Sequence, residues 1–419
     1  MRRVVVTGIG TINSTGHNVK DSFDAVVNGV CGIDTITLFD ASDFSVKIAG
    51  EVKDFDPTTV MDKKEVKKAD RFIQLGIKAA HEAMIDSGYV TADNKKVDGS
   101  IADRFGIISG SGIGGLSTIE RNSVVCETKG SRKVSPFFIP SSLANMLSGF
   151  ISIEHNLRGP SLAHVTACAA STHALNDAVK TIMIGGADRI LVVGAESAIC
   201  GAGVAGFAAM KALSTRNDDP KKSSRPFDID RDGFVMGEAA GALVVEDLEL
   251  ALARGAKIYA EIIGFGESGD ANHITSPVMD GPLRAMQAAF EMAKNITGEY
   301  PKIDYINAHG TSTPVGDKNE TAAIKALFGG KENAPLVSST KGQIGHCLGA
   351  AGAIEAIFTI KALNEGIIPP TINIENQDPE CDLDYVANVA RKLNLTTVMS
   401  NNFGFGGTNG SVIFRKYVK

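Results

Sequence analysis

The chain has 419 residues, of which 43% are hydrophobic and 21% charged, and its formal net charge is −6 at pH 7. This composition is typical of a soluble globular protein with a sizeable core, and the acidic balance argues against nucleic acid as a general partner. No stretch reaches the roughly 18 apolar residues of a membrane span, and the start lacks a signal-peptide pattern. We therefore expect a cytoplasmic protein without membrane association.

The spacing of the six cysteines and eight histidines argues against two classes of site. No two cysteines have the CxxC spacing of a zinc ribbon, and no histidines have the HExxH spacing of a metalloprotease. We therefore expect neither a disulfide framework nor a metal site.

Short apolar runs alternate with helical patterns along the chain, which predicts an α/β fold. One helix is expected over 70–87 with Gly88 as its stop, and an alanine-rich helix over 349–364 before Gly366. Residues 111–160 lack a clear period, and we expect an insertion on one face that lines a substrate tunnel or a subunit contact. Strands are expected at residues 4–6, 105–109, 190–194, 241–245, 258–264, 336–339, 397–400 and 410–414.

Two short segments resemble each other. Gly8-Ile9-Gly10 comes at the end of the first strand run, and Gly264-Phe265-Gly266 comes at the end of the run near residue 260. We expect a turn at each of them. The repetition indicates two related halves, 1–250 and 251–419.

A cysteine is the expected nucleophile. Residues 161–167 form an extended run that ends at Cys168, and a helical pattern follows until Gly185. Cys168 would therefore lie at a helix N-terminus, where free N–H groups and the helix dipole favour a thiolate. We expect the pKa of this thiol to fall from ~8.5 towards or below neutrality.

Two histidines lie in similar small-residue surroundings. His309 follows an apolar run and precedes the turn at 310–314, whereas His346 lies between Gly345 and a helix start. Glycine neighbours let a ligand approach an imidazole closely. One thiol and two imidazoles suffice to form a thioester, decarboxylate a second substrate and hold the resulting oxyanion.

A lysine stands five residues before the second histidine. Lys341 comes at the end of a buried-looking strand, where an ammonium needs a carboxylate partner. Glu355 and Glu320 are the candidates, and we expect the partner to be Glu355.

Together these motifs indicate a resemblance to a known family. The sequence resembles the β-ketoacyl-[acyl-carrier-protein] synthases of the thiolase superfamily, and most closely the synthase II group of bacterial type II fatty acid synthesis. The resemblance extends over essentially the whole chain. Besides the segments around Cys168, His309 and His346, the matching blocks are residues 3–8, 110–115, 225–228, 231–235, 349–352 and 401–410.

The resemblance implies a thiolase-like, five-layered α-β-α-β-α fold with two related halves, and a homodimer. It implies decarboxylative condensation of an acyl group on Cys168 with malonyl-[acyl-carrier-protein], giving 3-oxoacyl-[acyl-carrier-protein] for fatty acid elongation. Acyl carrier protein would be the partner, and no cofactor is expected. His309 and His346 would be the decarboxylation pair and Lys341 their support. Phe405 would be a mobile gate, and its backbone N–H would form the oxyanion hole with that of Cys168.

The resemblance also implies where substrates bind. Ile113 would lie at the far end of the acyl pocket, and the other substrate-binding residues would be Phe207, Thr311, Thr313, Phe403 and Glu355. Acyl carrier proteins are generally acidic, so a local basic patch would steer docking. The expected docking residues are Lys63, Lys64, Lys67, Lys68, Arg132, Lys133 and Lys211.

Several alternatives remain open. Synthase I-type and polyketide ketosynthases share the same chemistry. A coenzyme A-dependent thiolase normally needs a second cysteine near the C-terminus, which the loop 404–410 lacks, and a non-catalytic chain-length factor would lack Cys168. Gly110, Gly112 and Gly115 spell the GxGxxG of nucleotide-binding oxidoreductases, but no clean βαβ unit follows them.

Overall fold

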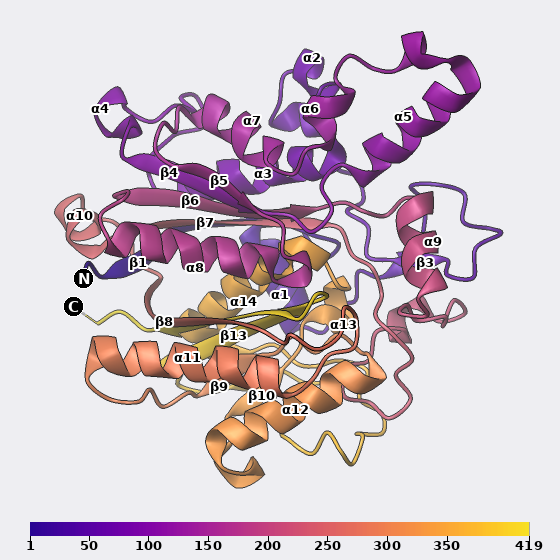
Figure 1. Ribbon diagram of the computed structural model, residues 1–419. Helices are drawn as coiled ribbons and strands as arrows, with labels where there is room; N and C mark the ends of the chain where they lie inside the picture. The colour runs from indigo at the N-terminus through magenta and orange to yellow at the C-terminus, as the bar shows by residue number, and fades with distance from the viewer. Residues whose placement is uncertain (419) are drawn as a thin grey trace.

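The computed structural model describes residues 1–418 and shows alternating layers of helices and strands (Figure 1). The first strands form the upper sheet in this view, with α3 (Arg71–Asp86) and α7 (Met146–His155) above it. Helices α8 (Ala170–Met183) and α14 (Ala351–Glu365) lie between the upper and lower strands. Below the lower strands lie α11 (Asp280–Thr297) and α12 (Pro314–Phe328), which completes five layers.

The strands of both β-layers join into one sheet. Among the described residues this sheet has ten strands in the order β10-β9-β13-β14-β8-β1-β7-β6-β4-β5. Their bounds are β1 Val4–Ile12, β4 Phe105–Gly110, β5 Ser161–His164, β6 Arg189–Glu196, β7 Ala239–Asp247, β8 Ala260–Gly269, β9 Tyr305–Asn307, β10 Leu336–Ser338, β13 Thr397–Gly404 and β14 Thr408–Arg415. Two small ribbons pair β2 (Asp34–Thr35) with β3 (Ile48–Ala49) and β11 (Ile367–Ile368) with β12 (Arg391–Lys392).

The remaining helices lie around these layers. They are α1 Val19–Val27, α2 Lys63–Val66, α4 Gly99–Ala102, α5 Leu116–Lys129, α6 Phe138–Ser142, α9 Gly201–Ala209, α10 Leu248–Ala253 and α13 Lys341–Ile344. The expected insertion at 111–160 is therefore largely helical, because it contains α5, α6 and α7. It lies on the outer face of the upper strands in Figure 1.

The two groups of five strands have the same topology. Numbered within its own group, each follows the order 3-2-4-5-1, and the last strand of each (β7 and β14) runs antiparallel to both neighbours. The groups join where β1 pairs with β8 through only three residues of each strand. The related halves indicated by the sequence are thus present as a repeated sheet topology.

The repeated glycines lie inside strands, not in turns as expected. A Cβ on Gly8 or Gly10 would lie 2.3 or 2.2 Å from a carbonyl oxygen of α3, and a Cβ on Gly264 or Gly266 would lie 2.4 or 2.0 Å from one of α11. Each Gly-x-Gly therefore lets an outer helix pack directly on the strand backbone. The strand register also shifts beside both segments, at Val6/Gly8 in β1 and at Ile413/Phe414 opposite β8.

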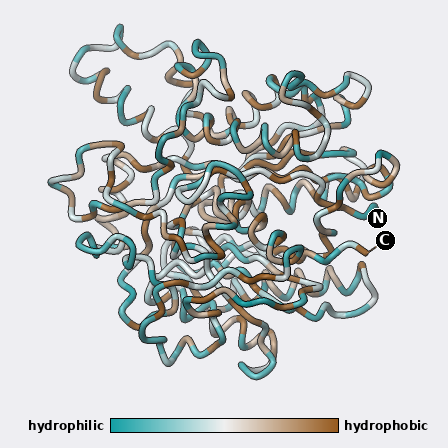
Figure 2. The backbone as a smooth tube through the Cα atoms, turned by 180° about the vertical axis from the view of Figure 1, so that it is seen from behind, coloured by the Kyte–Doolittle hydropathy of each residue, from teal (hydrophilic) through white to brown (hydrophobic). Residues whose placement is uncertain are grey.

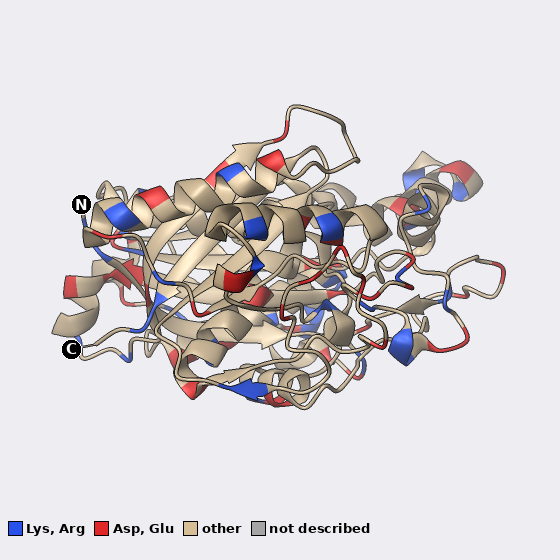
Figure 3. Cartoon of the chain, turned by 90° about the horizontal axis from the view of Figure 1, so that it is seen from below, with Lys and Arg blue, Asp and Glu red and all other residues tan. Residues whose placement is uncertain are grey.

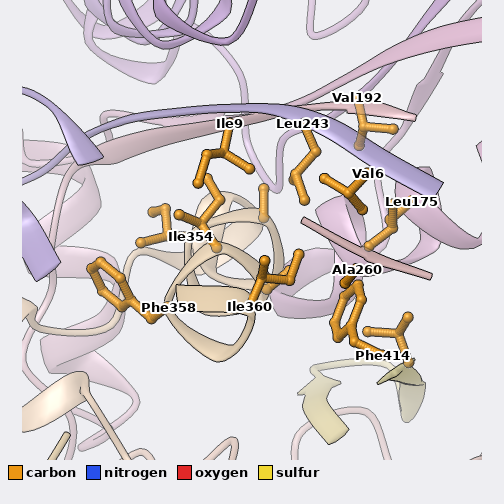
Figure 4. Packing of buried hydrophobic residues seen from close by; sticks show 14 of the residues in the cluster. Val6, Ile9, Leu175, Val192, Leu243, Ala260, Ile354, Phe358, Ile360 and Phe414 are labelled. Atoms are coloured by element: carbon orange, nitrogen blue, oxygen red, sulfur yellow. The ribbon is translucent and has the colours of Figure 1, made fainter. Parts of the chain in front are cut away.

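Burial follows the layers. Every residue of β6 and β7 is buried, as expected for strands covered by helices on both faces. Seen from behind, the outer loops are mostly hydrophilic (Figure 2). In the core between the sheet and the middle helices, residues of β1, β6 and β7 face the layer formed by α8 and α14 (Figure 4). The labelled examples are Ile9, Val192 and Leu243 from the strands, Leu175 from α8, and Ile354, Phe358 and Ile360 from α14.

The ends of the predicted helices follow local chemistry. The side chain of Asp70 accepts the N–H of Phe72 and caps α3, and Gly88 with φ 78° follows its end. Gly366 ends α14 in the left-handed conformation that glycine adopts without steric cost.

Candidate active site

A cavity of about 560 Å³ brings together the three reactive side chains of the sequence motifs. Cys168 comes from the short 3₁₀ turn Ala167–Ala169 before α8, His309 from the segment after β9, and His346 from the segment after α13. Cys168 is the only cysteine that lines this cavity within residues 1–418. The cavity thus draws its reactive groups from both halves of the chain.

The turn that carries Cys168 is sharply bent. Ala167 has φ 50°, in the left-handed region that alanine rarely occupies, and the 3₁₀ turn leads directly into α8. Thr408 Oγ1 donates to the carbonyl of Thr166 at 3.0 Å, which ties this turn to β14. Strained backbone that the surroundings hold in place is typical of reactive sites.

The two imidazoles lie on one side of the thiol. Nε2 of His346 is 3.0 Å from Sγ of Cys168, and the ring centroids of His309 and His346 are 5.3 Å apart at 86°. The backbone N–H of His346 donates to Val235 at 2.7 Å, and the His346 ring packs edge-on against Phe234. Both rings line the cavity together with the thiol.

Burial decides the protonation of all three groups. It lowers the pKa of both His309 and His346 well below 6.5, and the nearby Lys341 cation acts in the same direction. Both imidazoles are therefore neutral at pH 7. Burial raises the pKa of the Cys168 thiol to about 12, although Lys341 and the backbone N–H groups of Phe405 and Cys168 oppose this shift. Burial outweighs these opposing contributions, so the thiol pKa lies above its usual value and not towards neutrality as expected.

Lys341 lies behind the imidazoles and outside the cavity lining. Its ammonium pairs with Glu355, and both side chains are almost fully buried. The other Glu355 oxygen accepts from Asn402 at 2.6 Å. Glu355, expected among the substrate-binding residues, therefore has no face on the cavity.

Glu320, the other candidate partner of Lys341, has a different role in the structure. Its carboxylate accepts the backbone N–H groups of His309 at 2.9 Å and Gly310 at 2.8 Å. Burial raises the pKa of Glu320 to about 7, although these N–H groups oppose the shift. Glu320 holds the segment on which His309 lies.

The other pocket residues of the sequence analysis do line the cavity. They are Ile113, Phe207, Thr311, Thr313, Phe403 and Phe405, together with Lys211 from the docking group. The hydroxyls of Thr311 and Thr313 lie 3.1 Å apart. Phe207 packs against Phe405 with ring centroids 6.5 Å apart, which makes an aromatic wall beside Cys168.

The remaining docking residues lie elsewhere on the surface. Lys63 and Lys64 belong to α2 and Lys67 follows it, while Arg132 and Lys133 lie in the 3₁₀ turn Ser131–Lys133 after α5. Lys68 pairs with Glu65 at 2.6 Å and lies over the ring of Phe137. Of this set, Lys211 alone lines the cavity within the part of the chain that the structure describes.

Two features of the site have no sequence motif. The segment 270–277 lines the cavity mouth, and its Ile274 carbonyl accepts the N–H of Gly406 at 2.7 Å. The buried carboxylate of Glu196 accepts the N–H groups of Gly112 and Ile113 below the cavity. For Glu196 a signal existed, because it is a lone acidic residue at the end of an apolar strand.

Residues 1–418 contain no group of three or more histidine, cysteine or acidic side chains placed to hold a metal ion. They also contain no helix of the length and apolarity that crossing a membrane requires.

Comparison with known proteins places the chain in a family. Family models for the beta-ketoacyl synthase N-terminal and C-terminal domains match residues 1–251 and 259–375. The 3-oxoacyl-[acyl-carrier-protein] synthase 2 of Vibrio harveyi is 50% identical over 419 residues, with 99% of each chain covered. That of Coxiella burnetii is 48% identical over 416 residues, again with 99% of each covered.

Solved structures agree in fold. A beta-ketoacyl synthase from Burkholderia phymatum is 35% identical with a TM-score of 0.91, and 100% of both chains is covered. A type II PKS acyl-carrier protein in complex with its ketosynthase bound to the hexaketide gives a match at 29% identity and a TM-score of 0.85, covering 99% of this chain and 100% of the other. The chain belongs to the beta-ketoacyl synthase family.

Proposed function

We propose that the chain catalyses the decarboxylative condensation of an acyl group with malonyl-[acyl-carrier-protein] to give 3-oxoacyl-[acyl-carrier-protein] in fatty acid elongation. The observation that carries this proposal is the placement of His346 Nε2 at 3.0 Å from the Cys168 sulfur, with the second neutral imidazole, His309, beside it. The relatives at 48–50% identity have the same activity in their names. A thiolase reaction has less support, since the cavity offers no second cysteine.

In the first step the Cys168 sulfur attacks the thioester carbonyl of an acyl carrier. A carbon–sulfur bond forms to Cys168, the bond to the carrier thiol breaks, and the thiol proton passes to the departing sulfur. The backbone N–H groups of Phe405 and Cys168 act on Sγ and lower the pKa of the thiol. We assign to them the oxyanion of this step, because preorganised donors stabilise charge where it develops.

In the second step the malonyl thioester loses CO₂. The electron pair of the breaking carbon–carbon bond moves into an enolate, whose oxygen accepts hydrogen bonds from the N–H groups of His309 and His346. The enolate carbon then attacks the Cys168 thioester, a new carbon–carbon bond forms, and the carbon–sulfur bond breaks. The sulfur leaves as a thiolate, which takes up a proton from solvent to restore the thiol. Neutral imidazoles suit this role, since each has one N–H to donate and this N–H is far less acidic than that of an imidazolium, which would protonate the enolate.

Three single variants test the proposal. Cys168→Ala is expected to abolish condensation, and mass spectrometry should show acylation of the wild type only. His309→Ala and His346→Ala should still be acylated, but their decarboxylation of malonyl-[acyl-carrier-protein] should fall on the order of 10²-fold or more. An acylated Cys168→Ala protein, or either histidine variant releasing CO₂ at the wild-type rate, would refute these roles.

We also propose a homodimer built on the edge of the upper sheet. β5 is the edge strand, and its Leu162 and the following Val165 are 47% and 58% exposed. Ile153 of the adjacent helix α7 is 77% exposed. An open strand edge flanked by exposed apolar side chains is a template for pairing with a second copy. Leu162→Lys should convert the dimer to a monomer in light scattering; an unchanged mass in wild type and variant would contradict this.

Acyl carrier protein is the partner we propose. Lys211 lies at the cavity, whereas the two other basic groups lie on α2 and after α5. Figure 3 shows that positive and negative residues intermingle on the face seen from below, so docking would use local basic groups and not a uniformly positive face.

The six cysteines are free thiols, which is typical of the cytoplasmic compartment that we propose.

The junction between the halves is proposed to follow α10. The boundary expected at residue 250 falls inside this helix, which packs on β1 and β7 of the first half. The connector 254–259 before β8 is therefore the natural junction.

A further inference from the structure

The glutamate at the end of β6 has an unusual set of partners. Glu196 is fully buried, and its Oε2 accepts the N–H groups of Gly112 at 2.6 Å and Gly349 at 2.9 Å. Its Oε1 accepts the N–H of Ile113 at 3.1 Å and the hydroxyl of Ser111 at 3.0 Å. All four partners are donors, so a proton on either oxygen would face an N–H or displace the hydroxyl. Burial raises the pKa of Glu196, whereas the hydrogen bonds from all four donors oppose this shift and favour the carboxylate form.

The two segments that Glu196 holds form part of the cavity wall beside Cys168. Ile113 belongs to the turn after β4, and Leu348 begins the 3₁₀ turn Leu348–Ala350 that closely follows His346. Ile113 and Leu348 line the cavity and pack with Cys168 in one apolar cluster. One carboxylate therefore connects the wall of the acyl pocket with the segment next to the catalytic imidazole.

These walls touch without intervening side chains. A Cβ on Gly349 would lie 2.1 Å from the backbone nitrogen of Gly112, and a Cβ on Gly112 would lie 2.8 Å from Oε2 of Glu196. The contact also explains the GxGxxG pattern at 110–115. Its N–H groups at Gly112 and Ile113 are used by Glu196, so they are not free to hold a phosphate.

We propose that Glu196 is a positioning residue that sets the range of acyl chain lengths the cavity accepts. It does so by fixing Ile113 and Leu348 against each other in the cavity wall. The proposal rests on the function proposed above and adds a determinant of its specificity. Its physical basis is that discrimination by a few methylene groups requires a pocket end that does not yield.

Glu196→Gln is the direct test. The glutamine side chain has the same shape as glutamate, but its amide NH₂ cannot accept hydrogen bonds and faces two of the four donors. The assay is elongation of a series of acyl carriers from short to long, with malonyl-[acyl-carrier-protein] as second substrate. The chain-length ratio is kcat/KM for the longest accepted acyl chain divided by kcat/KM for the next longer chain. We expect this ratio to fall at least about fivefold in Glu196→Gln. In an Ile113→Ala background the same substitution should change that ratio by less than about twofold, because the side chain it positions is absent.

Controls separate this role from general damage. Glu82→Gln is a matched control, since the Glu82 carboxylate also accepts two backbone N–H groups, from Val19 at 2.8 Å and Thr11 at 3.1 Å, away from this cavity. It should leave the chain-length ratio unchanged. If circular dichroism shows that Glu196→Gln does not fold, Ser111→Ala, which removes one donor, should shift the ratio in the same direction by about twofold.

The outcomes are distinct. A wild-type protein that does not elongate any acyl carrier overturns the proposed function itself. A wild type that elongates, with an unchanged ratio in folded Glu196→Gln or an equal effect in the Ile113→Ala background, overturns the role of Glu196 alone.

Discussion

Replacing Lys341 by methionine is expected to leave Glu355 as an unpaired charge in the core. The two side chains are 1% and 0% exposed, and Asn402 at 2.6 Å would be the only remaining donor to the carboxylate. Removing one partner of a buried ion pair costs about 3–5 kcal/mol. We expect the free energy of unfolding of Lys341→Met to fall by that amount. The double variant Lys341→Met with Glu355→Gln should recover most of the loss, because no buried charge remains.

Urea unfolding followed by far-UV circular dichroism measures this directly, and tyrosine fluorescence is a second probe because the chain has no tryptophan. Lys325→Met is the matched control. It breaks a 2.8 Å pair with Asp382 whose side chains are 37% and 27% exposed, and should cost no more than about 1 kcal/mol. A loss below about 1 kcal/mol in Lys341→Met, or a double variant no more stable than the single one, would refute the reasoning.

The same substitution has an electrostatic consequence for the imidazoles. The Lys341 cation lowers the pKa of His309 and His346, so its removal should raise both values. The acid side of the pH–rate profile for decarboxylation should then move to higher pH in Lys341→Met and not in Lys325→Met.

Four further predictions concern the pH dependence of decarboxylation, the reactivity of the thiol, the pocket and docking. In the wild type, the pH–rate profile of decarboxylation should show no inflection near pH 6.5, because the pKa values of both imidazoles lie well below it. Below pH 6.5 these histidines bind more protons in the unfolded chain than in the folded one. They therefore make the free energy of unfolding fall as the pH is lowered through this range. Alkylation of Cys168 should accelerate about tenfold per pH unit without a plateau near neutrality, since its thiol pKa is raised, and a plateau near pH 7 would contradict this. Ile113→Phe should shorten the longest accepted acyl chain, and Lys211→Glu should raise KM severalfold for carrier-bound malonyl but not for a small pantetheine analogue. An unchanged chain-length profile, or equal losses on both substrates, would count against these two assignments.

The strand and helix pattern was predictable because it depends on local sequence. The helix that begins after Asp70 and ends at Gly88 has its capping residues in the sequence, and the apolar runs that became β4, β6 and β7 are buried on both faces. The Gly-x-Gly segments were misread as turns. Their glycines are required by the approach of α3 and α11, a contact between segments distant in sequence.

The site was predictable in its reactive side chains and less so in its electrostatics. The motif around Cys168 indicates a helix start, which by itself lowers a thiol pKa, but the sequence does not show how deeply the thiol is buried. Likewise, the choice between Glu355 and Glu320 depends on which carboxylate reaches Lys341 in space. The segment 270–277 acts through a backbone hydrogen bond, which leaves little pattern in a sequence. Glu196 stands out in the sequence as a lone acidic residue after an apolar strand, but its partners depend on the fold.

A single-turnover experiment tests the central claim most directly. The protein is first acylated with a labelled acyl carrier and freed of excess substrate, and malonyl-[acyl-carrier-protein] is then added. Intact-protein mass spectrometry and CO₂ release are followed together. The account predicts that label disappears from Cys168 in step with CO₂ release and appears in 3-oxoacyl-[acyl-carrier-protein]. Label that stays on the protein while product forms, or label that maps to a residue other than Cys168, would contradict it.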